Sequence, residues 1–395
     1  MSASGARQSE ILVIGGGIGG LSAALAFAQR GRRVRVLEKA PQFGEIGYGI
    51  QLGPNAYRML DALGVAQEIE QTAVFPDSLI LIDALTDSEL TRISCGAAFR
   101  ERYGAPYMVV HRRDLHGPLL EACRRHEGIT LQVSKELVQV TEHGDRVVAI
   151  CADGSQYEGA ALVGADGLRS RVREIVLGDG APRVAGHVTY RGVVPIDDVK
   201  DRTHFNDMVI WIGPNLHLVQ YRLRGGTVMN NVATVVSSRC KDGVSEFGGP
   251  DELLEAFAQT TPQVRGMLGY VGKDKQWMLH DRDPMPGWSR GRVTLLGDAA
   301  HPTLQYLAQG ACMAIEDALV LASLVARAGA DIGGALLAYE NERYLRTARV
   351  QLTARIFGDI IHCRAGARDL RNHLMAQRTP ETFWEVDWLY RGIQL

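Results

Sequence analysis

The sequence predicts an α/β protein in which a Rossmann-like, parallel-sheet domain is interleaved with a β-rich domain and followed by C-terminal helices. Near the N-terminus, residues 11–30 run from an apolar strand through a glycine-rich turn into an Ala/Leu-rich helix. Between residues 184 and 278 the pattern changes to closely spaced β runs. After residue 334 the chain becomes helical and rich in arginine.

The division into domains follows from these changes of pattern. A chain of 395 residues is long enough for two or three domains. We predict that residues 1–183 form the first domain, with an insertion from the second domain near residues 76–105. The β-rich domain would span residues 184–285, and residues 286–345 would return to the first domain. Residues 346–395 would form the C-terminal helical region.

The composition excludes several classes of protein. Hydrophobic residues make up 46% of the chain, charged residues 22%, and the net charge is −2. No basic block is present, so we expect no nucleic-acid partner. The six cysteines are scattered without a CxxC pair, which predicts free thiols, a cytoplasmic location and no metal site.

Residues 11–28 are apolar enough to raise the question of a membrane span, since Ser22 is their one polar side chain. Five glycines between Gly15 and Gly20 would weaken a membrane helix, whereas they suit a tight turn. The preceding residues also lack the basic region of a signal peptide. We therefore expect neither a transmembrane segment nor a signal.

The glycine-rich turn carries the first functional signal. Gly15 permits a tight turn, Gly17 lets the backbone approach a pyrophosphate, and Gly20 allows close packing of helix on strand. Glu38, at the end of the second strand, can accept hydrogen bonds from ribose hydroxyls and disfavours the 2′-phosphate of NADP. The pattern predicts a bound ADP moiety, against the alternative of a βαβ turn without ligand, and leaves NAD and FAD open.

A second signal lies in residues 293–318. An apolar strand ends at Gly297-Asp298, and a helix begins near Gly310 and Ala311 after a short loop. An acidic residue after a strand suits a ligand hydroxyl, and a helix start offers free N–H groups to an anion. One cofactor could use both features.

The middle of the chain offers a further Asp-Gly turn. Residues 131–140 and 146–152 form two predicted β runs, and the strand at residues 162–165 ends in Asp166-Gly167. Three arginines follow this turn at alternate positions, namely Arg169, Arg171 and Arg173. They could belong to a site for a polar ligand, or they could form a solvated helix face.

Four of these segments occur in the order seen in one family. The GGGIGG turn with Glu38, Arg112, the segment 166–173 and the segment 297–302 resemble those of single-component FAD-dependent aromatic hydroxylases, the relatives of p-hydroxybenzoate hydroxylase. The resemblance covers residues 10–390 and implies that family's fold, with an FAD-binding domain and a β-sheet substrate domain. It also implies tightly bound FAD, NADH as a transient electron donor, O2, a small aromatic hydroxy acid and a possible homodimer.

The resemblance assigns FAD contacts residue by residue. Glu38 would hold the adenosine ribose, Arg112 would contact the FAD, and Asp298 would bind its ribityl or pyrophosphate region. The helix start at Gly310 and Ala311 would face the pyrimidine end of the flavin. Gln51 and Leu137 complete the predicted FAD contacts. No second glycine fingerprint is present, so NADH would bind without a Rossmann domain of its own.

Within the family, the chain most resembles the branch that hydroxylates 3-hydroxybenzoate. Residues 213–221 resemble that branch's substrate strand, and residues 305–308 its flavin-side loop. Many salicylate-hydroxylase-like relatives have Pro in place of Gln305, and in this respect the chain matches the 3-hydroxybenzoate branch. Many of them also have Asn in place of Cys312, and we have no interpretation of this second difference. The resemblance implies para-hydroxylation of 3-hydroxybenzoate to gentisate (2,5-dihydroxybenzoate) through a flavin C4a-hydroperoxide.

The same segments predict the catalytic residues. His217 and Tyr221 share one face of a strand with Val219 between them. His217 would be the base, or the hydrogen-bond acceptor, for the phenol. Tyr221 would orient the substrate carboxylate or hydroxyl, and Gln305 would fix the ring so that the carbon para to the hydroxyl faces the flavin. The alternative makes His217 and Tyr221 a satisfied polar pair within a sheet.

Other activities stay open at this point. The chain could be a salicylate 1-hydroxylase or a 6-hydroxynicotinate 3-hydroxylase within the same enzyme class. An FAD-dependent prenyl reductase would share a related fold, and a non-catalytic flavin-binding protein would share the cofactor. The sequence does not decide among aromatic substrates, oligomeric states, routes for NADH or movements of the flavin.

Overall fold

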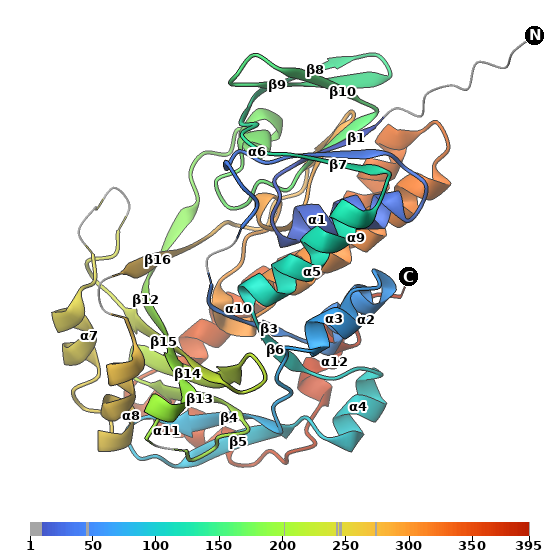
Figure 1. Cartoon of the computed structure of the whole chain (residues 1–395). Helices are drawn as coiled ribbons and strands as arrows, with labels where there is room; N and C mark the ends of the chain where they lie inside the picture. The colour runs from blue at the N-terminus through green and yellow to red at the C-terminus, as the bar shows by residue number, and fades with distance from the viewer. Residues whose placement is uncertain are drawn as a thin grey trace, which may run out of the picture.

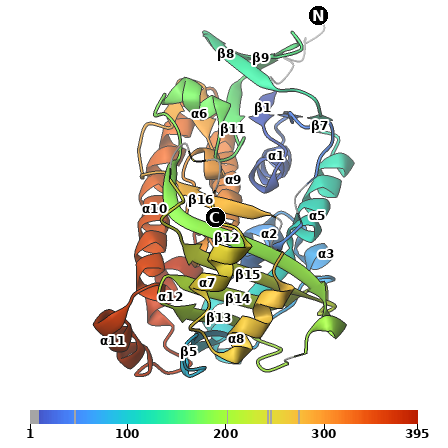
Figure 2. The ribbon, with the colours of Figure 1, turned by 90° about the vertical axis from the view of Figure 1, so that its left-hand side faces the viewer.

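The computed structural model describes residues 10–394, apart from residues 45–46, 201, 242–243, 245–246 and 273–274. Within this part of the chain, two large β-sheets lie toward opposite ends of the molecule (Figure 1). Long helices run between and beside them, and α10 (Ile332–Ile361) follows one side of the molecule from one sheet to the other (Figure 2).

The first sheet has six strands in the order β17-β18-β11-β1-β2-β7. They are β1 (Ile11–Ile14), β2 (Val34–Leu37), β7 (Ile129–Gln132), β11 (Ala161–Gly164), β17 (Ser289–Arg290) and β18 (Val293–Leu295). All neighbours run parallel except β17 and β18. The strand, glycine turn, helix and second strand predicted for residues 11–37 are confirmed, with α1 at Ile18–Ala28.

The predicted β run at residues 131–140 is divided between two sheets. β7 ends at Gln132, and β8 (Leu137–His143) pairs instead with β9 (Arg146–Cys151), which pairs with β10 (Gln156–Gly159). Ser134 takes a positive φ of 55° between them and donates its N–H to the carbonyl of Ala40. The chain turns there, which the alternation of apolar residues alone did not reveal.

The second sheet has seven strands in the order β16-β12-β15-β14-β13-β4-β5. They are β4 (Ser78–Asp83), β5 (Glu89–Ser94), β12 (Arg183–Pro195), β13 (Met208–Gly213), β14 (Leu216–Leu223), β15 (Val228–Val236) and β16 (Gln276–Asp281). β4 joins β13 in parallel, so an early segment of the chain completes a sheet built mainly from later residues. Helices α7 (Pro250–Ala256) and α8 (Pro262–Met267) pack on its outer face, where Trp211 and Leu218 are buried.

The remaining elements connect and cover the two sheets. β3 (Gly49–Leu52) and β6 (Met108–His111) form a two-stranded sheet of their own. The other helices are α2 (Pro54–Ala62), α3 (Ala66–Glu70), α4 (Ala97–Tyr103), α5 (Arg112–Arg125), α6 (Arg171–Val176), α9 (Gly310–Arg327), α11 (Ala365–Met375) and α12 (Trp384–Tyr390). Short 3-10 turns occur at η1 (Ile196–Asp198), η2 (Leu268–Tyr270), η3 (Gly297–Ala299) and η4 (Gln305–Leu307). No helix in the described ranges is both long and apolar enough to cross a membrane.

Candidate active site

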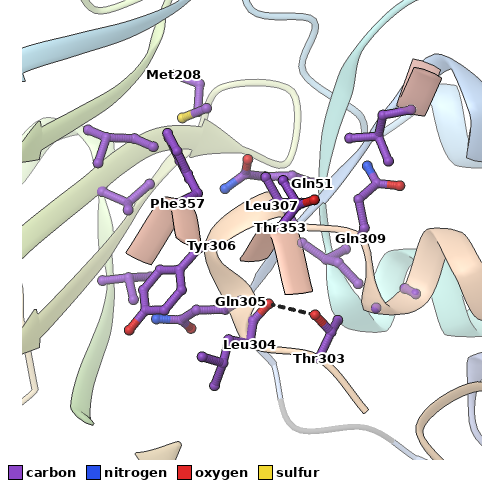
Figure 3. A pocket seen from close by; sticks show the side chains of 18 of the residues that line it. Gln51, Met208, Thr303, Leu304, Gln305, Tyr306, Leu307, Gln309, Thr353 and Phe357 are labelled. Atoms are coloured by element: carbon purple, nitrogen blue, oxygen red, sulfur yellow. Dashed lines mark hydrogen bonds between the residues drawn. The ribbon is translucent and has the colours of Figure 1, made fainter. Parts of the chain in front are cut away.

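One large cavity, with a volume of about 1100 Å³, is lined by elements of both sheets. One part of its wall comes from the glycine turn, the loop after β18 and the start of α9. The other part comes from the inner face of the seven-stranded sheet, the η4 turn and the C-terminal helices. Figure 3 shows the η4 side chains Gln305, Tyr306 and Leu307 in this wall, together with Gln51 and Phe357.

The glycine turn has no room for side chains. A Cβ on Gly15 would lie 2.4 Å from the carbonyl oxygen of Ala165, and the φ of Gly15 is +105°. A Cβ on Gly20 would lie 2.0 Å from the carbonyl oxygen of Gly15. Gly17 caps α1 without a side-chain hydrogen bond, and the first turn of α1 holds no acidic residue. The helix start therefore presents its N–H groups to the cavity, as an anion-binding turn requires.

Glu38 lies directly beside this turn. Its carboxylate accepts hydrogen bonds from the N–H of Gly16 at 2.7 Å and from the N–H of Ala40 at 2.8 Å. Each carboxylate oxygen can accept more than one bond, so Glu38 can still accept from a ribose hydroxyl. The structure thus places Glu38 beside the glycine turn, where Gly17 lines the cavity and Gly15, Gly20 and Glu38 lie next to its wall.

The loop after β18 carries the second predicted group. Asp298 lines the cavity with an exposed side chain, and a Cβ on Gly310 would lie 3.6 Å from its Oδ1. Gly310 and Ala311 begin α9 and line the same wall. No side chain caps α9 and no acidic residue occupies its first turn. A second uncapped helix start therefore faces the cavity, next to a carboxylate that can accept from a hydroxyl.

A buried ion-pair network holds this loop in place. Asp317 accepts hydrogen bonds from the N–H of Gly297 at 3.0 Å and from His301 Nε2 and Arg343 Nε, both at 2.6 Å. Burial raises the pKa of Asp317, but its ion pairs with His301 and Arg343 outweigh burial and leave the pKa below its ordinary value. The role of His301 is therefore to position the loop.

Residues 166–173 form hydrogen bonds within their own turn and with the loop after β18. Asp166 accepts from Ser170 Oγ at 2.5 Å and from the N–H of Arg171 at 2.7 Å, and Ser170 caps α6 by accepting from the N–H of Arg173. Arg173 is buried and donates to the carbonyl oxygens of Ala299 and Ala300 in the loop after β18. Arg173 is thus a buried structural residue, whereas Arg169 and Arg171 are exposed to solvent, and none of the three lines the cavity.

The other predicted cofactor residues divide into two groups. Gln51 lines the cavity, and its Oε1 accepts from Tyr107 Oη at 2.7 Å. Arg112 lines it too, as the first residue of α5, and its N–H donates to the carbonyl of Tyr48. Leu137 is only 5% exposed and packs in the core behind β1, so its side chain does not line the cavity.

The predicted catalytic strand is β14, which presents His217, Val219 and Tyr221 to the cavity. His217 and Tyr221 do not bond each other. His217 Nδ1 lies 2.8 Å from His362 Nε2, and the two imidazole rings stack at 5.0 Å. Burial lowers the pKa of His217 to about 3 and raises the pKa of Tyr221 to about 12. Both groups are therefore neutral at ordinary pH.

Sequence reasoning missed the residues that surround His217. His362 caps the end of α10, 145 positions away from His217 in the chain. Tyr306 Oη lies 2.5 Å from His187 Nδ1, and the rings of Tyr306 and His187 both pack against His362. Because this cluster joins four distant segments, no local pattern in the sequence could indicate it.

Gln305 is held by three protein groups. Its Oε1 accepts from Arg191 Nη2 at 2.8 Å, and its Nε2 donates to Thr189 Oγ1 at 3.2 Å and Thr234 Oγ1 at 3.0 Å. Both N–H groups of the amide are thus used within the protein. Arg191, a cavity-lining residue on β12, is a further residue that sequence reasoning missed.

Comparison with known proteins identifies the family. Residues 8–353 match the family model described as an FAD binding domain. The chain is 47% identical to 3-hydroxybenzoate 6-hydroxylase 1 of Aquipseudomonas alcaligenes, across 97% of this chain and 98% of that protein. It is 45% identical to 3-hydroxybenzoate 6-hydroxylase of Polaromonas naphthalenivorans, across 96% and 95% of the two chains. The chain belongs to the FAD-dependent aromatic hydroxylases.

A solved structure supports the same assignment. Klebsiella pneumoniae HpxO complexed with FAD and uric acid superposes with a TM-score of 0.86, at 27% identity, across 98% of this chain and 97% of that one. The hydroxylase is therefore an FAD-dependent monooxygenase with the predicted α/β fold. Its two uncapped helix starts, the side-chain-free turn at Gly15 and the carboxylates of Glu38 and Asp298 fit the phosphates and hydroxyls of FAD.

Proposed function

We propose that this hydroxylase converts 3-hydroxybenzoate to gentisate, with NADH as electron donor and O2 as oxidant. The observation that carries the proposal is the wall opposite the FAD cradle, where His217, Tyr221 and Gln305 surround an apolar floor. The two relatives named above, which match this chain almost from end to end, support the choice of substrate. When bound, the reduced FAD supplies an electrophilic oxygen derived from O2.

His217 serves the substrate hydroxyl in this proposal. Its Nδ1 is engaged with His362, so Nε2 is the nitrogen that remains for the substrate. For Nε2 to accept from the phenol, Nδ1 must carry the ring proton and donate it to His362 Nε2. Because burial lowers the pKa of His217, the imidazole polarises the phenol by accepting its hydrogen bond and does not retain the proton.

The other wall residues orient the ring and exclude water. Tyr221 stays protonated because burial raises its pKa, so its Oη can donate to the substrate. Val219 and Val232 form the apolar floor between the polar groups, and Phe357 and Leu307 line the cavity beside it. Such an enclosure keeps bulk water from the reacting atoms and strengthens each hydrogen bond within the site.

A substrate panel tests the proposal. The purified holoenzyme is mixed with NADH in air-saturated buffer and with 3-hydroxybenzoate, salicylate or 6-hydroxynicotinate, and NADH, oxygen and products are measured. We expect gentisate from 3-hydroxybenzoate, about one per NADH, and the highest kcat/KM for this substrate. Catechol from salicylate as the fastest reaction would contradict the proposal, as would hydroxylation of 6-hydroxynicotinate at the highest kcat/KM.

The remaining alternatives give different results in the same panel. A flavin-dependent prenyl reductase consumes no oxygen with an aromatic substrate. A flavin-binding protein without catalysis shows no substrate-stimulated oxidation of NADH.

A further inference from the structure

The side chain of Arg191 lies at a distinctive place on the inner face of the seven-stranded sheet. In the cross-strand register, Arg191 on β12 faces Val232 on β15, which faces Val219 on β14. These three residues form one row across the sheet, and all three line the cavity. The adjacent row is Thr189, Thr234 and His217. Arg191 is therefore about two strand spacings, roughly 10 Å, to the side of the strand that carries His217.

The hydrogen bonds of Arg191 direct it toward the row of His217. Its Nη2 donates to Gln305 Oε1, and the amide of Gln305 donates in turn to Thr189 and Thr234. The guanidinium also lies 5.7 Å from the ring centre of Tyr48. A planar guanidinium fixed by an amide on one side and an aromatic ring on another keeps its remaining N–H groups in a defined direction.

Arg191 has no anionic partner in the part of the chain that the structure describes. Its guanidinium contacts the neutral amide of Gln305 and the ring of Tyr48. Burial lowers the pKa of Arg191, and the nearby charge of Arg112 lowers it further. A partly buried cation without a counter-charge is costly, and an incoming carboxylate removes that cost.

We infer that Arg191 anchors the carboxylate of an aromatic acid and that Gln305 positions its guanidinium for this contact. The inference rests on the proposed function and deepens it, since it names the residue that binds the substrate carboxylate. With the hydroxyl at His217 and the carboxylate at Arg191, the ring is attached at two points. Two-point attachment fixes which ring carbon faces the FAD, and so fixes the position of hydroxylation.

Gln305 also explains the departure from Pro seen in many relatives. A proline side chain has no oxygen to accept from Arg191 and no N–H to bond Thr189 or Thr234. In this hydroxylase the amide links the arginine to the row that contains His217. Gln305 thus acts on the substrate through Arg191 rather than by direct contact with the ring.

Ligand binding tests the inference without turnover. The holoenzyme is titrated with benzoate and with the neutral benzamide, and binding is followed through the flavin absorbance. In Arg191→Met the dissociation constant of benzoate should rise about 10- to 100-fold, because a charge-assisted hydrogen-bonded contact is lost. The dissociation constant of benzamide should change less than about threefold.

A matched control lies on the opposite face of the same sheet. Arg222 donates to Asn206 Oδ1 at 2.6 Å and its guanidinium lies 4.5 Å from the ring centre of Phe205, so its surroundings resemble those of Arg191. Arg222 does not line the cavity. Arg222→Met should leave the affinity for benzoate unchanged.

A second variant keeps the arginine and changes only its partner. Gln305→Glu places a carboxylate against Arg191, which competes with the ligand anion. Benzoate should bind at least about tenfold more weakly, with little change for benzamide. This variant carries the test if Arg191→Met does not fold.

Two results would overturn the inference. One is wild-type affinity for benzoate in Arg191→Met, or in Gln305→Glu if the first variant does not fold. The other is a loss of FAD or a raised KM for NADH with an unchanged affinity for benzoate, since Arg191 would then serve a cofactor. Charge-selective binding through Arg191 without formation of gentisate from 3-hydroxybenzoate would leave the anchor standing and contradict the proposed function alone.

Discussion

At the scale of single residues, the cavity places polar groups where a hydroxylated aromatic acid needs them and apolar groups between them. His217 and Tyr221 are both nearly inaccessible to solvent, and burial keeps each of them neutral. Neutral groups in a dry site discriminate by hydrogen bonding, whereas Arg191 supplies charge. The following two substitutions test the contribution of hydrogen bonding at His217 and that of the charge held in place by Gln305.

His217→Asn should lower the rate of hydroxylation about 10- to 100-fold, because the acceptor for the phenol is displaced. NADH oxidation should continue and release hydrogen peroxide. The ratio of gentisate to NADH consumed measures the effect, and full yield at the normal rate would remove His217 from the mechanism.

The pH dependence of the reaction gives a separate test of His217. Because burial lowers the pKa of His217 to about 3, the imidazole does not titrate between pH 5 and 8. The plot of kcat/KM against pH should therefore have the same shape over this range in the wild type and in His217→Asn.

Gln305→Met should preserve the volume of the side chain and remove all three of its hydrogen bonds. We expect more hydrogen peroxide per NADH and hydroxylation at more than one ring position, because Arg191 is no longer held. Chromatography of the products together with a peroxide assay measures both effects. Gln305→Pro, which introduces the residue found in many relatives, should act in the same direction. Unchanged coupling and a single product would contradict the role of Gln305.

At the scale of elements, the sequence was sufficient to predict structure that forms within a short segment. It was insufficient to predict contacts between segments that are far apart in the chain. The βαβ unit at residues 11–37 was predictable, because apolar strands and glycines specify it within 30 positions. The bond from His217 to His362 was not, because it depends on where α10 ends relative to β14. Arg191 was missed for the same reason, since only the register of β12 places it on the cavity face.

The turn between β1 and α1 gives a prediction at this scale. Gly15→Ala should lower the content of FAD and the stability together, because the new Cβ would collide with the carbonyl oxygen of Ala165, the residue after β11. Gly31→Ala is a matched control, since its φ is +76° and no atom lies within 4 Å of the new Cβ. This control should cost about 1–2 kcal/mol of backbone strain and retain FAD.

The ratio of flavin to protein absorbance and the thermal unfolding temperature distinguish the two glycine variants. Equal loss of FAD in both would mean that a general loss of stability, rather than the close approach to Ala165, accounts for the loss of the cofactor.

At the scale of the whole molecule, the substrate site is incomplete without the cofactor. The cavity is continuous from the glycine turn to the inner face of the seven-stranded sheet, so FAD bound at the first wall would form part of the enclosure for the substrate. Among the described residues no strand of one sheet pairs with a strand of the other, and α10 contacts β17 and β18 of the six-stranded sheet as well as the η4 turn beside the seven-stranded one. Stability should therefore depend on FAD, and binding of the aromatic acid should depend on it as well.

Thermal unfolding of the apoprotein tests this dependence. FAD at 100 times its dissociation constant stabilises the folded state by about 2.7 kcal/mol. Since the entropy of unfolding is about 2.1 cal/mol/K per residue, a chain of this length should gain roughly 3 °C in Tm. Benzoate should raise the Tm of the holoenzyme further and leave that of the apoprotein unchanged, because only the holoenzyme encloses the ring. An equal rise in both forms would show that the aromatic acid binds independently of the cofactor.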